Sequence, residues 1–346
     1  MTGFGKKKEK DLNGSKVKSN SILEDAINYQ IEGNYLEAEK LYRILIKNGY
    51  KDSGILNNYG LICKKLNRPE ESKQLFQEAI NLYPNKPQAF CNLANNLCEE
   101  GDYVKAEEYA RKAIQMKPIL INSLLILSNI MLRQGKNNEA LLYLQRVHNI
   151  NPNSFAANIN LGALLQERGD LKEAADCFRK ATIIEPRNSM ALRNLGGVLK
   201  DLNEIEKAES MLKKAISIDP KSAINYIHLS SILLEKLKLN EAEQMVKHAI
   251  KIDPSIAESY LCLGKILLNK GKTIEGRKSL YKSIDLNSNL ANSYYHISTI
   301  SNIEIESKLR ENLFSEDMLL EQNPKHKIDI YFARANVFNQ DNDLDN

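Results

Sequence analysis

Apolar residues recur at three- and four-residue intervals through most of this chain of 346 residues. Residues 155–188 are the clearest example, because two such runs, at about 156–167 and 171–184, predict two amphipathic helices joined by a tight turn. The arrangement returns every 34 residues, and a proline marks each period: Pro84, Pro118, Pro152, Pro186, Pro220 and Pro254. A fixed period of this length predicts an all-α stack of helical hairpins, each packed against its neighbours in the chain.

The period fits eight full units in residues 19–290, and we call the two helices of each unit helix A and helix B. The eighth residue of every unit is small: Ala26, Gly60, Ala94, Ser128, Gly162, Gly196, Ser230 and Gly264. The twentieth residue is small as well: Ala38, Ser72, Ala106, Ala140, Ala174, Ala208, Ala242 and Gly276. Small side chains at both positions would let the two helices of one hairpin approach closely, whereas a bulky residue would overpack the contact.

Glycine or asparagine stands at most turns between the two helices, where a helix end needs a left-handed backbone: Gly33, Asn67, Gly101, Gly135, Gly169, Asn203 and Gly271. The seventh unit has Leu237 instead, which predicts a turn that is distorted or differs by one residue. Each proline of the period is expected to stop helix B and to begin the link to the next unit.

The clearest unit resembles the tetratricopeptide repeat in the following residues: Asn160, Leu161, Gly162, Gly169, Asp170, Leu171, Ala174, Phe178, Ala181 and Pro186. The resemblance recurs in register over residues 19–290 and weakens in the first and eighth units, as is expected of capping units. It implies a right-handed superhelical α-solenoid of helix-turn-helix repeats, in which the A helices line a concave groove. It also implies a non-catalytic scaffold that binds a protein or peptide segment in that groove.

The resemblance places the second, fifth, sixth, ninth and twelfth residues of helix A on or near the groove. Asparagine occupies the sixth position in four units: Asn58, Asn92, Asn160 and Asn194. An amide both donates and accepts hydrogen bonds, so a row of asparagines can hold the backbone of an extended peptide. The row resembles the asparagine ladder of O-linked N-acetylglucosamine transferase. The alternative is that each asparagine bonds a neighbouring helix, and the sequence leaves both readings open.

Five other groove residues are predicted to tune the selectivity of binding: Asn95, Arg193, His228, Lys265 and His296. The carboxylate clamp of co-chaperone members of the family needs Lys and Asn one turn apart on helix A. This chain pairs Asn57 with Leu61 and Cys91 with Asn95, so the clamp is not expected.

Both ends of the chain depart from the period. Lysines crowd residues 1–18, which lack apolar periodicity and are predicted to form a disordered basic tail. Residues 291–346 are predicted to hold a degenerate ninth repeat and a helical C-terminal segment that ends in an unpaired helix A, at 327–340. An unpaired helix leaves an apolar face uncovered. It would cap the array, pair with a partner, which includes self-association of the chain, or be the stub of a longer protein.

No pattern favours catalysis, a metal or a cofactor. Gly271-Lys272-Thr273 ends like a phosphate-binding loop, but Ile266 stands where the loop needs an earlier glycine. The five cysteines are scattered without CxxC spacing, and no apolar run reaches the roughly 18–20 residues of a membrane helix. We therefore expect a cytoplasmic protein that does not bind membranes. The net charge of +4 is modest and the groove residues are mixed, which argues against nucleic acid.

A second hypothesis belongs to the enzyme class. Residues 304–346 resemble, in Ser315-Glu316-Asp317 and Tyr331-Phe332-Ala333, a linker that joins such repeats to a C-terminal sulfotransferase domain in some bacterial proteins. The chain would then be the substrate-recognition half of a sulfotransferase or glycosyltransferase whose catalytic domain is absent from it.

Overall fold

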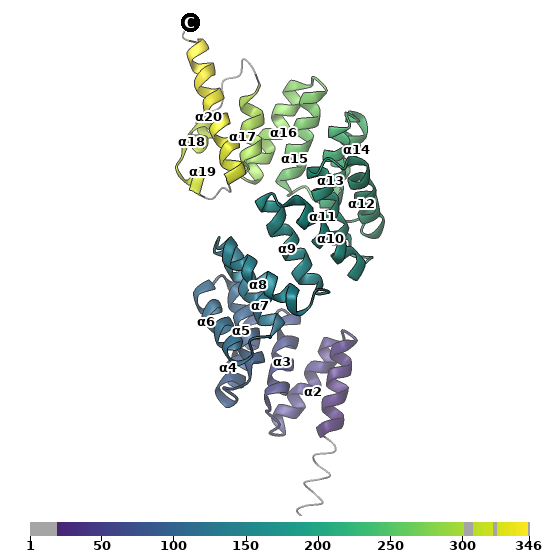
Figure 1. Cartoon of the computed structure of the whole chain (residues 1–346), viewed down its shortest axis with the longest axis vertical. Helices are drawn as coiled ribbons and strands as arrows, with labels where there is room; N and C mark the ends of the chain where they lie inside the picture. The colour runs from purple at the N-terminus through teal and green to yellow at the C-terminus, as the bar shows by residue number, and fades with distance from the viewer. Residues whose placement is uncertain (1–18, 301–306, 321–323, 345–346) are drawn as a thin grey trace, which may run out of the picture. The chain divides into compact units, whose positions relative to one another are not determined.

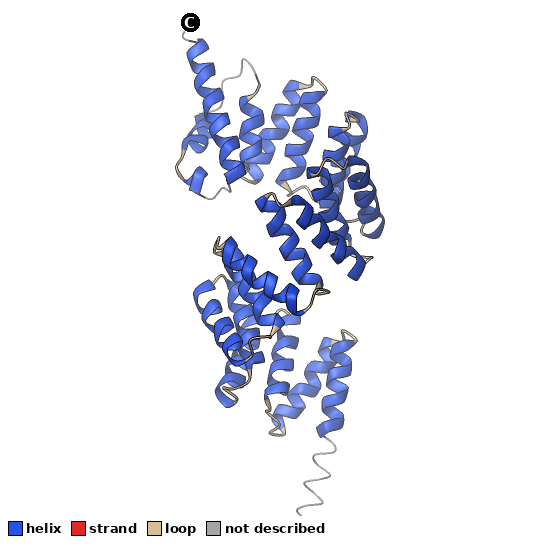
Figure 2. Ribbon diagram, viewed as in Figure 1, coloured by secondary structure: helices blue, strands red, loops and turns tan. Residues whose placement is uncertain are grey.

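The computed structural model describes residues 19–300, 307–320 and 324–344, and every regular element in these ranges is a helix (Figure 2). The chain divides into two compact units, residues 1–164 and 165–346, and the boundary falls within α9 (Phe155–Arg168). Within each unit, most successive helices form hairpins, in which helix B also packs on the following helix A. The prediction of an all-α solenoid of helix pairs is therefore confirmed.

The first unit starts with a helix at residues 19–31 and continues through seven labelled helices before it reaches α9 (Figure 1). These are α2 (Tyr35–Lys47), α3 (Ser53–Lys65), α4 (Pro69–Leu82), α5 (Pro87–Glu100), α6 (Tyr103–Met116), α7 (Ile121–Arg133) and α8 (Asn137–Ile150). The odd-numbered helices α3, α5 and α7 are A helices that begin at the first residue of a predicted unit, so the period read from the sequence fixes the helix starts.

The second unit continues the pattern. Its hairpins use α10 (Leu171–Ile184), α11 (Ser189–Asp201), α12 (Ile205–Ile218), α13 (Ala223–Glu235), α14 (Leu239–Ile252), α15 (Ala257–Asn269) and α16 (Thr273–Leu286). The C-terminal part contains α17 (Ala291–Ser298), α18 (Ser307–Phe314), α19 (Asp317–Leu320) and α20 (Pro324–Leu344). The helices before Pro186, Pro220 and Pro254 all end two residues ahead of the proline, as expected.

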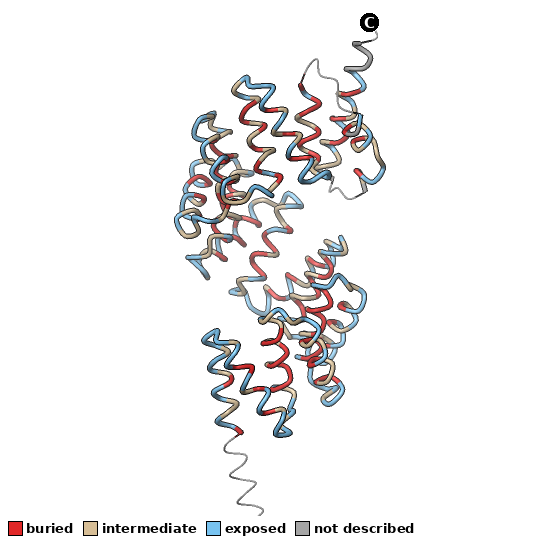
Figure 3. Tube along the Cα trace, turned by 180° about the vertical axis from the view of Figure 1, so that it is seen from behind, coloured by how far each residue is buried: buried red, intermediate tan, exposed pale blue. Residues whose placement is uncertain are grey.

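The small residues lie where the helices of a hairpin touch. All sixteen residues at the eighth and twentieth positions are buried. Figure 3 shows that buried positions recur along the helices. A Cβ added to Gly264 would lie 2.7 Å from Leu280 Cγ and 3.1 Å from the backbone oxygen of Gly276. Because the two backbones approach this closely, any larger side chain there must push the helices apart.

The turn at Leu237 has the same geometry as the other turns between helix A and helix B. Leu237 adopts a left-handed conformation with φ of 56°, as Asn203 does with φ of 62° in the preceding hairpin. The backbone hydrogen bonds of the turn are kept, with Leu237 N donating to Leu234 O and Lys238 N donating to Leu233 O, both at 2.9 Å. The prediction of a distorted turn is therefore wrong, since the hairpin imposes its turn on a residue that disfavours it.

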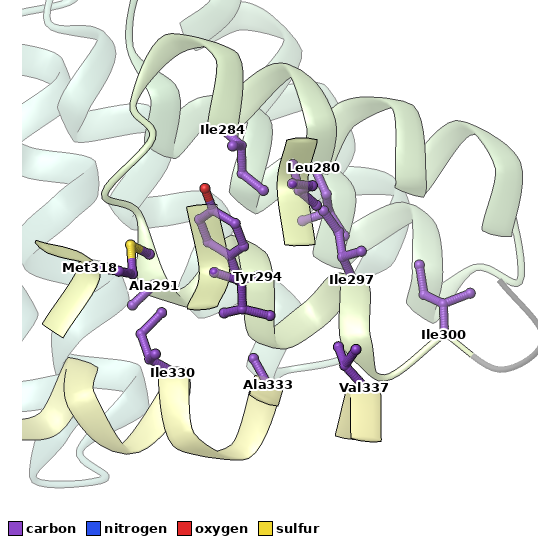
Figure 4. Close-up of a cluster of buried hydrophobic side chains, with 12 residues drawn as sticks. Leu280, Ile284, Ala291, Tyr294, Ile297, Ile300, Met318, Ile330, Ala333 and Val337 are labelled. Carbon is purple, nitrogen blue, oxygen red and sulfur yellow. The ribbon is translucent and has the colours of Figure 1, made fainter. Parts of the chain in front are cut away.

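The C-terminal helix α20 packs against α17. The two helices run in the same direction, since Asn292 Nδ2 donates to Asp329 Oδ2 near their starts and Asn336 Nδ2 donates to Ser298 Oγ further along. Ile330, Ala333 and Val337 of α20 point into the same apolar cluster as Tyr294 and Ile297 of α17 (Figure 4). Ala335 of α20 is exposed, because the buried face of the helix carries Ile330, Ala333 and Val337 instead. That α20 is a helix A without a helix B of its own stays a prediction.

An arginine of α20 holds the C-terminal end of α18. Arg334 of α20 donates from Nε to Leu313 O and from Nη2 to Ser315 O, both at 2.8 Å, at the end of α18. The opposite face of α20 exposes apolar side chains: Ile328, Tyr331, Phe332 and Phe338. The predicted disordered tail, residues 1–18, lies outside the described residues.

Glutamates on two B helices tie neighbouring hairpins together in the second unit. Glu209 accepts from Lys213 at 2.6 Å and from Lys236, at the end of the next helix A, at 2.7 Å. Glu243 pairs in the same way with Lys247 and Lys270, both at 2.6 Å. The two lysines around each carboxylate lower its pKa to about 2, against the desolvation that opposes the shift.

Neighbouring glycines on α11 give a matched test of the close approach. A Cβ at Gly196 would lie 2.9 Å from Leu212 Cγ and 3.3 Å from Ala208 O, whereas a Cβ at Gly197 meets nothing closer than 3.9 Å. We expect Gly196→Ala to lower the free energy of unfolding by about 1–3 kcal/mol. Gly197→Ala should raise it by up to about 1 kcal/mol through helix propensity. Urea denaturation followed by circular dichroism measures both, and equal effects would contradict the packing account.

The paired glutamates predict a pH dependence of stability. A carboxylate whose pKa is lowered by folding from 4.5 to about 2 stabilises the fold above pH 4.5, and this contribution is lost as the pH falls towards 2. The double variant Glu209→Gln, Glu243→Gln should therefore lose less stability than the unmodified chain over this range. Glu173→Gln with Glu275→Gln, two exposed glutamates outside the ion pairs, is the control. Urea midpoints between pH 6 and pH 2.5 that shift in parallel for all three proteins would contradict this assignment.

Candidate binding grooves

A groove of about 390 Å³ lies along the A helices of the first unit, on α3, α5 and the start of α7. Five of its eleven lining residues carry amide side chains, and we call it the amide groove: Asn57, Asn58, Gln88, Asn92 and Asn122, with Lys86 beside them. Helical spacing brings them together, since Asn57 and Asn58 occupy the fifth and sixth positions of one unit and Asn92 occupies the sixth position of the next. Two of the predicted site residues, Asn58 and Asn92, therefore meet in one groove.

Part of the hydrogen-bonding capacity of the amide groove is used within the protein. Asn92 Nδ2 donates to Asn57 Oδ1 at 3.1 Å, which joins the A helices of adjacent units. Asn57 Nδ2 donates to the backbone oxygen of Ser53 at 2.7 Å. The bond to a neighbouring helix that the sequence offered as an alternative thus exists for Asn92. Its amide still has a second N–H and an oxygen for a ligand.

Two further predicted residues of the first unit lie outside this groove. Asn95 is one turn after Asn92 on α5, half-buried, and its Nδ2 donates to Glu99 Oε1 at 3.3 Å. Asn160, on α9, is also half-buried. Of the predicted asparagines in the first unit, Asn58 and Asn92 line the amide groove, and Asn95 and Asn160 do not.

A second groove, of about 630 Å³, lies along the A helices of the second unit, on α13 and the start of α15. Aliphatic side chains dominate it, and we call it the apolar groove: Ile224, Ile227, Ile256 and Leu286, with His228 and Glu258. Five of these residues hold the same positions in the 34-residue repeat as residues of the amide groove. Ile224, Ile227, His228, Ile256 and Glu258 correspond to Gly54, Asn57, Asn58, Lys86 and Gln88.

His228 is the predicted site residue within the apolar groove. Burial and the positive charge of Arg193 lower the pKa of His228 to about 4, so its imidazole is neutral at pH 7 and offers one donor and one acceptor. Arg193 lies on α11, half-buried like its neighbour Asn194, and desolvation lowers the pKa of its guanidinium. Within the described residues, no carboxylate lies within 4 Å of the Arg193 guanidinium, and Asp219 acts on it only through its more distant charge.

Lys265 and His296, further along the second unit, are again a basic residue and a buried histidine whose pKa it lowers. Lys265 is half-buried on α15, and His296 lies on α17. Burial and the charge of Lys265 lower the pKa of His296 to about 4. On the same helix as Lys265, the buried thiol of Cys262 lies 3.0 Å from Ser230 Oγ, and desolvation raises its pKa, which makes it unreactive.

Several lining residues were missed at the sequence level. Asn57, Gln88 and Asn122 were not singled out in the first unit, nor were Ile224, Ile227 and Ile256 in the second. Most of them stand at the second or fifth position of helix A, which the family resemblance already assigned to the groove. A comparison of these two positions along the chain would have revealed the contrast between amide and aliphatic residues.

Within the ranges that the structure describes, no three His, Cys, Asp or Glu side chains come together in a way that could hold a metal ion. All five cysteines are buried and free. A search of the described helices finds none with the length and apolar character required to cross a membrane.

Models of the tetratricopeptide repeat match the sequence at residues 53–86, 87–119 and 191–222, and a second model of the same repeat matches residues 131–195. No curated protein sequence matches the chain. The matched segments cover both units and fall on the helical hairpins.

Solved structures share the fold. The Cut9–Hcn1 hetero-tetramer of APC/C matches with a TM-score of 0.62 at 11% identity, over 75% of this chain and 51% of that one. The chain therefore spans about half the length of that protein. PilF of Pseudomonas aeruginosa matches with a TM-score of 0.53 at 15% identity, over 62% and 97% of the two chains. A tetratricopeptide repeat protein of Parabacteroides merdae gives 0.53 at 16% identity, over 72% and 98%.

Proposed function

Because the chain belongs to the tetratricopeptide-repeat family, we propose that it is a non-catalytic scaffold which binds an extended segment of a partner protein along its A helices. The amide groove is the observation that carries this proposal. It gathers five amide side chains in one hollow of about 390 Å³, and the N–H and C=O groups of an extended backbone are the partners that amides suit best. Recognition of this kind is tolerant of the ligand's sequence, because it reads the backbone.

The proposal divides the roles of the predicted residues. Asn58, Asn92, Asn160 and Asn194 hold the backbone of the ligand, while Asn95, Arg193, His228, Lys265 and His296 select among side chains. Arg193 and Lys265 supply positive charge, and the two neutral histidines supply one donor and one acceptor each. The role as recognition half of a transferase and the self-association of the chain through α20 stay predictions.

Alanine variants of the amide groove test the backbone-holding role. A random peptide library displayed on phage supplies ligands, and fluorescence anisotropy gives the Kd of one selected peptide. The double variant Asn58→Ala, Asn92→Ala should weaken binding by roughly 5- to 150-fold, because two hydrogen bonds are worth about 1–3 kcal/mol in total. Asn138→Ala with Asn149→Ala, two exposed asparagines on α8, is the matched control and should leave the Kd unchanged.

A peptide with N-methylated backbone amides separates backbone recognition from other causes. It should bind the unmodified chain more weakly than the parent peptide does, and the difference should shrink in the double variant, as in a double-mutant cycle. Circular dichroism confirms that the variant is folded. An unchanged Kd in a folded double variant contradicts the role of Asn58 and Asn92.

A further inference from the structure

The two grooves share five positions of the repeat, and at three of them the apolar groove carries isoleucine where the amide groove carries a small, amide or charged residue. At three corresponding positions the amide groove has Gly54, Asn57 and Lys86, whereas the apolar groove has Ile224, Ile227 and Ile256. The hairpins of the first unit pack normally with Gly, Asn and Lys at these positions. The fold therefore does not require isoleucine there, and packing alone does not explain the apolar groove.

The aliphatic side chains of the apolar groove remain open to solvent. Ile224 is 43% exposed and Leu286 is 36% exposed, while Ile227 and Ile256 are half-buried. Apolar surface that faces water in a hollow of about 630 Å³ gains free energy when a ligand covers it. A hollow of this volume accommodates a large side chain of a bound segment.

One charged residue lines this groove. Glu258 stands in the first turn of α15, is exposed, and forms no ion pair with any other described residue. His228 on the opposite helix is neutral at pH 7, and the remaining lining residues are uncharged. A positive charge on a ligand therefore complements Glu258, the charged residue of the lining.

We propose that the apolar groove receives a large aliphatic or aromatic side chain of the partner segment, and that a Lys or Arg next to this anchor residue pairs with Glu258. The inference rests on the proposed function, to which it adds the chemistry of the ligand. The first unit would hold a segment by its backbone, and the second unit would select segments by an anchor residue and a neighbouring base.

The test exchanges the chemistry of one groove for that of the other. The variant Ile227→Asn, Ile256→Lys installs the residues that the first unit carries at the same positions, which keeps the risk of misfolding low. Ile183→Asn with Ile274→Lys, two isoleucines that are 71% and 64% exposed and line neither groove, is the matched control. A phage-displayed random peptide library is selected against each protein, and anisotropy gives the Kd of the best peptide.

The unmodified chain and the control should enrich peptides that share a large apolar residue beside Lys or Arg, and the groove variant should not. The best peptide should bind the groove variant about tenfold or more weakly. Replacement of its anchor by Ser should weaken binding to the unmodified chain but not to the variant. Selection against the Glu258→Lys variant should enrich peptides that carry Asp or Glu where those selected by the unmodified chain carry Lys or Arg. In methyl NMR spectra, the peptide should shift the δ1 methyl signals of Ile227 and Ile256.

Other outcomes separate the two proposals. If peptides are enriched and depend on Asn58 and Asn92 but share no apolar anchor, or if the groove variant retains the anchor preference, this inference is overturned and the proposed function stands. If no peptide is enriched, both fail together. If the chain self-associates and Ile227→Asn, Ile256→Lys abolishes this, the occupant is a second copy of the chain, and the inference is again overturned.

Discussion

The stack depends on the close approach of helix A and helix B at two small residues in each hairpin. At Gly264 and Gly276 an added Cβ would lie 3.1–3.2 Å from the backbone oxygen of the facing glycine, so the two backbones are themselves in contact. This constraint explains why the eighth and twentieth residues stay small through eight units. It also leaves the second, fifth and sixth residues of helix A free to vary, because they do not take part in the contact within the hairpin.

The groove residues could be anticipated in part, since the sixth position was recognisable and Asn58, Asn92 and His228 do line grooves. The bond from Asn92 to Asn57 was not predictable, because two asparagines 35 positions apart meet only through the geometry of adjacent A helices. The contrast between Asn57 and Ile227 also required the structure. Each residue is unremarkable within its own helix, and the difference appears only when both are found lining corresponding hollows.

The fold could be predicted from the sequence wherever the 34-residue period continues. The prediction was incomplete where the period stops. Gly196 and Gly197 are adjacent on α11, and the repeat position alone identifies Gly196 as the glycine in contact with helix B. Leu237 misled the prediction, since its intrinsic preference opposes a conformation that the surrounding hairpin imposes. The placement of α20 on α17 could not be foreseen, because α18 and α19 separate the two helices in sequence and their apolar faces match only in three dimensions.

The central claim is that the A helices, and not the B helices, present the binding surface. Photo-cross-linking with a selected peptide that carries a benzophenone, followed by mass spectrometry of the modified chain, tests it most directly. We expect the cross-links to fall on α3 and α5 around Asn58 and Asn92, and on α13 and α15 around Ile227 and Glu258. Cross-links confined to the B helices, such as α4, α6, α12 and α14, would contradict the account.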